Sequence, residues 1–278
     1  MVKGSRLFTS LAAIGVLLSV VSAHNLMAAQ KFAGTWVNPY PQGNTLNDVW
    51  GASGTDVFAV GDMGTIVHYD GTTWRLMASG TEAGLQGVWG TSGNNVFAVG
   101  EGGTILHYDG QTWAAMDSPT SADLAAVWAA TPSAVFAVGS SGTILHYDGL
   151  SWSAMDVSDL YDQFEDTDFL SVWGLSAEEV YVGGLFGQVY VFNGSSWAIQ
   201  GDVDGEAIYF WVEGIWGTAS DDLWVVGWES LGGGPQIHHY DGSSWRRAPT
   251  GTTEPLYTVW GAGPEVFVVG GGGTILHR

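Results

Sequence analysis

Apolar residues occur along this chain in short runs, and polar turns that contain glycine separate the runs. The same succession of runs is repeated six times: one ending in Val-Trp-Gly, one like Val-Phe-Ala-Val-Gly, one like Thr-Ile-Leu-His-Tyr, and a last one that starts with tryptophan. The copies begin near Leu46, Leu85, Leu124, Phe169, Val212 and Leu256, and their first tryptophans are 39, 39, 45, 43 and 44 residues apart. Short, regular runs of this kind predict β-strands.

Each repeat predicts four strands. The third and fourth strands are joined by Asp-Gly or Asn-Gly, which favours a tight hairpin because these residues tolerate positive φ. The hairpins begin at Asp70, Asp109, Asp148, Asn193 and Asp241. The second strand is apolar at successive positions, which is typical of a sheet buried on both faces. The repeat length and the four strands predict an all-β fold, a six-bladed β-propeller of four-stranded antiparallel blades.

The two ends of the repeat region are expected to complete one blade together. The sixth copy stops at Arg278, within its third strand, and lacks a fourth. Trp36 lies 14 residues before Trp50, close to the 15 residues that separate the corresponding tryptophans of intact copies. We expect residues 31–40 to supply the missing strand at the N-terminus, because an open ring would expose unpaired edges. The predicted propeller domain therefore spans residues 31–278.

Residues 1–23 have the pattern of a secretory signal peptide. Lys3 and Arg6 precede an apolar run from Leu7 to Val21, and the small residues near Ala23 offer a cleavage site. Cleavage as late as residue 29 also fits the sequence. We expect a secreted or periplasmic protein without a membrane span after cleavage, and a retained anchor helix is the alternative. The chain has no cysteine, so disulfides are not available to it.

The chain is strongly acidic, with 7 Lys and Arg against 28 Asp and Glu and a net charge of −21. Removing Lys3 and Arg6 with the signal leaves 7 − 2 = 5 basic residues. This balance excludes nucleic acid as a partner and disfavours an anionic membrane surface, because both would be repelled. We expect a soluble monomer that attracts cations.

The repeat resembles those of two bacterial propeller groups. The succession Leu-x-x-Val, Val-Phe-Ala-Val-Gly and Thr-Ile-Leu-His-Tyr-Asp-Gly-x-x-Trp resembles the tectonin-type repeat of six-bladed sugar-binding lectins. Gly-x-Gly-Gly-Thr-Ile-Leu-His with Asp-Gly-x-x-Trp is similar to the Asp-box-like repeats of photosystem assembly factors and sialidases. Asp70 and Gly71 are adjacent, however, where a full Asp-box has a spacer. Both resemblances cover residues 31–278, rest on residues that build blades, and leave the ligand open.

Most of the conspicuous side chains occupy repeat positions. Five histidines recur in the third strand, namely His68, His107, His146, His239 and His277. We interpret them as structural, because one histidine per blade at equal radius places them too far apart to share an ion; a ring of metal ligands is the alternative. Twelve of the 15 tryptophans occupy the two repeat positions, and Trp224 replaces a phenylalanine of the second strand. Trp211 and Trp228 remain without a repeat position.

Residues outside the repeat gather around blades three to five. Insertions separate copies three, four and five, at residues 156–168 and 201–210, and a long loop is expected at residues 228–235. Such connections emerge on one face of a propeller, so we expect them to build the binding face. The candidate ligand-binding residues are Tyr161, Phe186, Tyr209, Phe210, Trp211, Glu213, Trp228 and Glu229. The alternative is that the aromatic residues only fix these loops to the disc.

Four carboxylates of the insertions are candidate ligands for Ca²⁺, which prefers hard oxygen donors. They are Asp162, Asp166, Asp202 and Asp204. The segment Asp202-x-Asp204-Gly205 resembles part of a calcium loop, but it lacks the third ligand and the distal glutamate. No other cofactor is expected.

No residue is assigned a catalytic role. The chain has few arginines for a sialidase-like site, no cysteine nucleophile and no Gly-x-Ser-x-Gly motif. Aromatic rings stack on sugars, and carboxylates accept hydrogen bonds from hydroxyl groups. The sequence therefore favours a secreted, non-enzymatic propeller that binds carbohydrate through the loops of blades three to five. A protein-docking scaffold or assembly factor is the alternative, and a polysaccharide hydrolase or lyase that uses paired carboxylates comes third.

Overall fold

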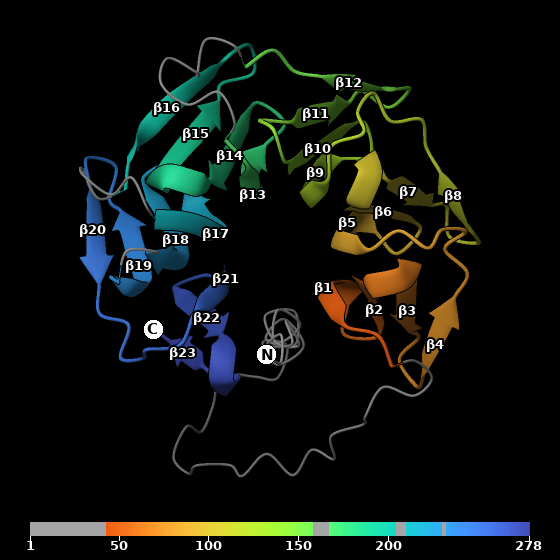
Figure 1. Ribbon diagram of the computed structural model, residues 1–278, viewed down its shortest axis with the longest axis horizontal. Coiled ribbons are helices and arrows are strands. Elements are labelled where there is room, and N and C mark those ends of the chain that lie inside the picture. Colours follow the sequence, from red (N-terminus) through yellow and green to blue (C-terminus); the bar gives the residue numbers. More distant parts are fainter. Residues whose placement is uncertain (1–42, 158–166, 204–209, 230–231) are drawn as a thin grey trace.

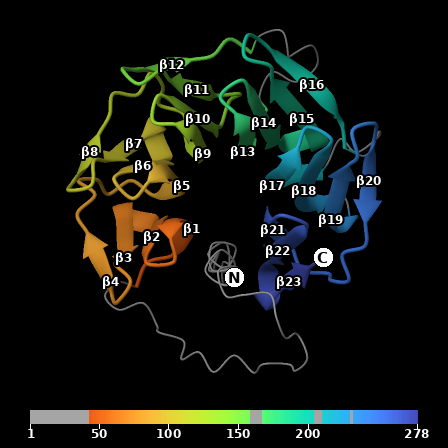
Figure 2. The ribbon, with the colours of Figure 1, turned by 180° about the vertical axis from the view of Figure 1, so that it is seen from behind.

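The computed structural model describes residues 43–157, 167–203, 210–229 and 232–278. Six antiparallel sheets surround a central axis like the blades of a propeller (Figures 1 and 2). The strands are β1 (Leu46–Ser53), β2 (Asp56–Gly61), β3 (Thr65–Tyr69), β4 (Trp74–Met77), β5 (Leu85–Ser92), β6 (Asn95–Gly100), β7 (Ile105–Tyr108), β8 (Trp113–Ala115), β9 (Leu124–Thr131), β10 (Ala134–Gly139), β11 (Ile144–Tyr147), β12 (Trp152–Ala154), β13 (Phe169–Ser176), β14 (Glu179–Gly184), β15 (Gln188–Phe192), β16 (Trp197–Asp202), β17 (Phe210–Ala219), β18 (Asp222–Glu229), β19 (Gly234–Tyr240), β20 (Trp245–Ala248), β21 (Leu256–Ala262), β22 (Glu265–Gly270) and β23 (Ile275–His277).

Every sheet follows the chain in simple up-and-down order, with its first strand nearest the axis (Figure 1). Five sheets have four strands each, and the sixth has three described strands, β21, β22 and β23. The predicted all-β, six-bladed architecture is confirmed. The strand expected from residues 31–40 lies outside the described residues, so the closure of the ring by the N-terminus stays a prediction.

The two faces of the disc carry different connections. After the second strand most blades have a single-turn element: η1 (Asp62–Gly64), η2 (Glu101–Gly103), η4 (Leu185–Gly187) and η5 (Gly271–Gly273). The N–H of Asp62 donates to the carbonyl of Thr45 at 3.0 Å, which places η1 beside the start of β1. We call the face on which the first strands begin the front face, because it is turned to the viewer in Figure 1. The Asp-Gly hairpins lie on the opposite, back face.

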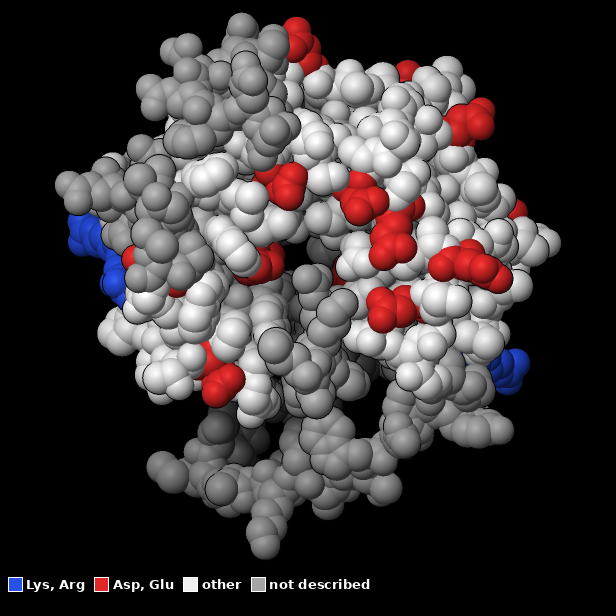
Figure 3. All heavy atoms as spheres, viewed as in Figure 1, with Lys and Arg blue, Asp and Glu red and all other residues white. Residues whose placement is uncertain are grey.

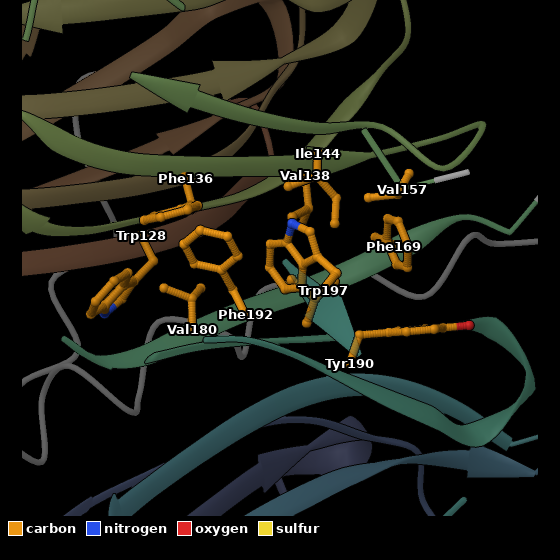
Figure 4. Packing of buried hydrophobic residues seen from close by; sticks show 11 residues of the cluster. Trp128, Phe136, Val138, Ile144, Val157, Phe169, Val180, Tyr190, Phe192 and Trp197 are labelled. Atoms are coloured by element: carbon orange, nitrogen blue, oxygen red, sulfur yellow. The ribbon is translucent and has the colours of Figure 1, made fainter. Parts of the chain in front are cut away.

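The hydrophobic core consists of layers between neighbouring blades. Figure 4 shows the layer between blades three and four, where Phe136 and Val138 of β10 face Val180 of β14 and Trp197 of β16. These four side chains are at most 8% exposed. Because a blade is covered on both sides, most residues of its second strand are buried, as the run of apolar residues predicted.

The recurring histidines have structural surroundings. Each of the five stacks on or tilts against an aromatic ring of the second strand, with ring centroids 4.2–4.8 Å apart. Nε2 of His68 lies 2.7 Å from Asp56 Oδ1, and Nε2 of His239 lies 2.7 Å from Asp222 Oδ1. A residue at the start of the second strand therefore holds the imidazole in these blades, which agrees with the structural interpretation.

Helix is nearly absent from the part of the chain that the structure describes. None of its helical elements is long and apolar enough to cross a membrane. The expected signal peptide, residues 1–23, lies outside this part, so secretion stays a prediction.

Candidate functional site

Blade five departs from the repeat where other blades have a short η turn. β17 begins at Phe210, two residues before the position at which β1 begins, and β18 and β19 are lengthened to match. The added pairs are Phe210–Glu229 and Trp211–Trp228, and Trp228 also faces Pro235. The sequence predicted a loop at residues 228–235, which includes Trp228, and an insertion that ends next to Trp211. The loop position is wrong, because both tryptophans lie within paired strands.

The extension of blade five has an aromatic side and a buried side. Residues directly opposite each other on paired strands point to the same side, so Trp211 and Trp228 share one side and Phe210 and Glu229 the other. The side chain of Trp211 is 41% exposed, and that of Trp228 is half-buried. Phe210 is fully buried, and its ring lies 5.4 Å from that of His238. Contrary to expectation, Phe210 therefore belongs to the core.

A row of polar side chains holds the buried side of the extension together. His238 and Gln236 of β19 are fully buried, and Nε2 of His238 lies 2.7 Å from Oε1 of Gln236. The amide of Gln236 donates in turn to the carboxylate of Glu229 on β18. Blade one has Val67 and Thr65 at the positions of His238 and Gln236. Since buried polar groups must be hydrogen-bonded, this row ties the lengthened strands to one geometry, and it gives Glu229 a structural partner.

Phe186 lies next to the extension, at the tip of η4. Its φ of 74° is in the left-handed region, which costs roughly 1–3 kcal/mol for a residue other than glycine. Blades two and six have Gly102 and Gly272 at the same position, and blades one and three have Met63 and Ser141 there, also with positive φ. The η4 turn contacts β17, so the half-buried Phe186 is close to the start of that strand.

The front face carries acidic side chains, and no basic one among the described residues. Figure 3 shows acidic residues around the central opening, and Lys and Arg only at the rim. The acidic residues of the η turns, the first strands and the connections into them include Asp62, Glu82, Glu101, Asp123, Asp168, Glu213 and Glu254. The described arginines are Arg75, Arg246, Arg247 and Arg278, which follow the back-face hairpins or the third strand of blade six. The front face is therefore negative.

Some of these carboxylates also hold the blades together. Asp123 accepts a hydrogen bond of 2.7 Å from the N–H of Gly102, and Asp168 accepts one of 2.9 Å from the N–H of Ser141. Each bond joins the turn of one blade to the connection that leads into the next. Substitutions at Asp123 or Asp168 would thus disturb the fold as well as the charge.

Several predicted site residues lie outside the described residues: Tyr161, Asp162, Asp166, Asp204 and Tyr209. Asp202 is the last residue of β16. Within the described ranges, no group of three or more His, Cys, Asp or Glu could hold a metal ion. The calcium site stays a prediction.

Asp48 was missed by the sequence analysis. Its carboxylate, on β1, accepts hydrogen bonds of 2.8 Å from the N–H groups of Val49 and Val88, and the second bond joins β1 to β5 of the next blade. Burial raises the pKa of Asp48 to about 7, although the two N–H groups lower it. The available signal was a carboxylate at a repeat position where blades two and four have Gly87 and Ser171.

Comparison with known proteins supports the fold. No protein-family model matches the chain, and no curated protein matches it. Among solved structures, the computationally designed Ika8 protein has a TM-score of 0.63 at 16% identity, over 84% of this chain and 70% of that chain. YCF48 bound to D1 peptide has a TM-score of 0.47 at 15% identity, over 85% and 92% of the two chains. YCF48 from Cyanidioschyzon merolae has a TM-score of 0.48 at 16% identity, over 86% and 97%.

This chain is a β-propeller. The six sheets around one axis show this fold directly. At identities of 15% and 16% the likeness is one of fold alone.

Proposed function

We propose that this propeller is a non-enzymatic binding protein that docks a protein partner on its front face at blade five. The observation that carries the proposal is Trp211, whose side chain is 41% exposed although it lies on a paired strand. Pairing with β18, which is itself paired with β19, fixes the backbone beneath it. A partner that covers Trp211 therefore orders little additional chain, which favours affinity.

The surroundings of Trp211 resemble the composition of a protein interface. Tryptophan is enriched among the residues that contribute most to binding, and interfaces combine an aromatic centre with a polar rim. Here Trp228 pairs with Trp211, and carboxylates surround the central opening (Figure 3). These features support docking of a protein segment.

Carbohydrate binding is the second candidate, and the same exposed indole favours it, because aromatic faces stack on sugar rings. Glu213, two residues after Trp211, offers an acceptor for a hydroxyl group. A negative face adds nothing to the binding of a neutral sugar, however, whereas it attracts a positively charged protein surface. We therefore place protein docking first.

Two arrays test this proposal, one of synthetic peptides of varied composition and one of glycans. Each is probed with the wild-type protein, with Trp211→Ala and with Leu150→Ala, a matched control because Leu150 is 90% exposed on a back-face hairpin. We expect peptides that bind the wild type and Leu150→Ala but not Trp211→Ala. Binding to glycans alone, lost in Trp211→Ala, would contradict protein docking. Absence of any signal that depends on Trp211 would contradict the front-face site.

Export is part of the proposal, on the pattern of residues 1–23. Mass spectrometry of the mature protein is expected to find a first residue between 24 and 30. A mature chain that retains Lys3 and Arg6 would contradict export by cleavage.

A further inference from the structure

We infer that the segment docking at blade five is a cationic peptide, with lysine or arginine on either side of an apolar residue that rests on Trp211. This inference rests on the proposed docking function and specifies its ligand. Two features lead to it: an open apolar platform on blade five and a negative charge on the same face.

The platform is the side of blade five that is turned toward blade six. Trp224, Val226 and Trp228 are every second residue of β18 and therefore point to the same side of the sheet. Trp224 and Val226 pack into the core shared with blade six. Trp228 and its partner Trp211 continue this apolar row beyond the core, to the front face. The platform therefore consists of two neighbouring indoles on a fixed pair of strands.

In blades one and two, the η turn lies against the connection that leads into the next blade. In blade one, a Cβ added at Gly64 would lie 2.1 Å from the carbonyl oxygen of Thr81, in the connection to blade two. In blade five, β18 and β19 continue as paired strands at this place instead of forming an η turn. Trp211, on the neighbouring strand β17, is 41% exposed there.

Two carboxylates belong to the elements next to the platform. Glu213 follows Trp211 on β17, and Glu254 precedes β21 of blade six. The described arginines lie elsewhere, and Arg75 and Arg246 pair with Asp70 and Asp241 of the back-face hairpins. A cationic ligand would supply the complementary charge that this face lacks in its described part.

An arginine of the ligand would also suit the indoles themselves. Within this protein, Cζ of Arg278 lies 4.8 Å from the ring centroid of Trp224. Guanidinium groups are attracted to the face of an indole because its π-electrons are negative. Trp211 offers an exposed indole on the negative front face, so the same contact is favourable there.

Fluorescence anisotropy with short labelled peptides tests the inference. The probe alternates lysine and arginine with serine around one central leucine; a second peptide has glutamate at every basic position, and a third has glycine in place of the leucine. The protein variants are Trp211→Ala and the double variant Glu213→Gln/Glu254→Gln. Their controls are Leu150→Ala and Asp221→Asn, which remove an exposed apolar and an exposed acidic side chain of the back face.

We expect the cationic peptide with leucine to bind. Its affinity should fall about tenfold or more in Trp211→Ala, several-fold in the double variant, and not in either control. Raising the salt from about 50 to 200 mM should weaken binding, because it screens the charges. Equal losses of affinity in Asp221→Asn and in the double variant would show that only the total charge of the protein matters, and would overturn the inference. Binding of the glutamate peptide as tightly as the cationic peptide would also overturn it. If neutral peptides on the array bind in a Trp211-dependent way and the cationic probe does not, this inference fails while protein docking stands.

Discussion

At the scale of single residues, Trp211 and Trp128 have the same side chain on an inner strand but opposite relations to solvent. Trp128 is 5% exposed on β9 and tilts against Phe136 at a centroid distance of 6.3 Å. Trp211 is 41% exposed and precedes the repeat position of β17. The two kinds of tryptophan can be distinguished from the sequence, because Trp128 occupies a position common to all copies of the repeat and Trp211 does not.

Substitution of these two tryptophans should therefore have different effects on stability. Trp128→Ala leaves a cavity between blades and should lower the free energy of unfolding by about 3–5 kcal/mol. Trp211→Ala removes one cross-strand pair and should lower it by about 1 kcal/mol or less. Urea unfolding of the two variants and the wild type measures both values. Similar losses in the two variants would assign Trp211 to the core and remove the main support for the docking site.

At the scale of elements, the strands follow from local pattern, and the blade-five extension does not. The apolar runs and the Asp-Gly steps were sufficient to predict β2, β3 and the back-face hairpin that follows them. The segment from Gly232 to Pro235 indicated a loop, because glycine and proline disfavour strand interiors. The pairing of Trp211 with Trp228 and the buried contact between Gln236 and His238 extend the strands nonetheless. Such contacts join positions distant in the chain, so periodicity alone could not reveal them.

The joint between β1 and β5 should make stability depend on pH through Asp48. With a pKa of about 7 when folded against 3.8 as the ordinary value, this carboxyl binds its proton more tightly in the folded state. Its contribution to stability therefore falls as pH rises from about 4 to 7, because the charged form is the one that burial penalises. Asp48→Asn removes this contribution.

Thermal melts of Asp48→Asn and the wild type between pH 4 and pH 8 test this expectation. The stability of the variant relative to the wild type should rise with pH over that window. A constant difference across the window would show that Asp48 keeps its ordinary pKa in the folded protein.

At the scale of the whole molecule, the open question is which segment supplies the fourth strand of blade six. Ile275 of β23 is 54% exposed, whereas Ile105, at the same position in blade two, is 1% exposed. Blade two has β8 beside its third strand, and Trp113 of β8 is 8% exposed. The sixth sheet has no corresponding strand among the described residues, and residues 31–40 carry Trp36 at the equivalent repeat position.

Deletion of residues 31–40 should accordingly lower the melting temperature, because the edge of β23 and its apolar side chains would be exposed. Trp36→Ala should have a smaller effect in the same direction. Deletion of residues 24–30, which leaves the Trp36 segment intact, is the control. If the protein without residues 31–40 melted like the control, closure by the N-terminal segment would be wrong.

The central claim concerns which face of the disc a partner covers. Hydrogen–deuterium exchange, with and without the array peptide that binds most tightly, measures this most directly. We predict slower exchange in peptic fragments that contain residues 210–213 and 228–229, and unchanged exchange in the back-face hairpins around Asp70, Asp148 and Asp241. Protection confined to those hairpins, or absent from the strands of blade five, would contradict the account.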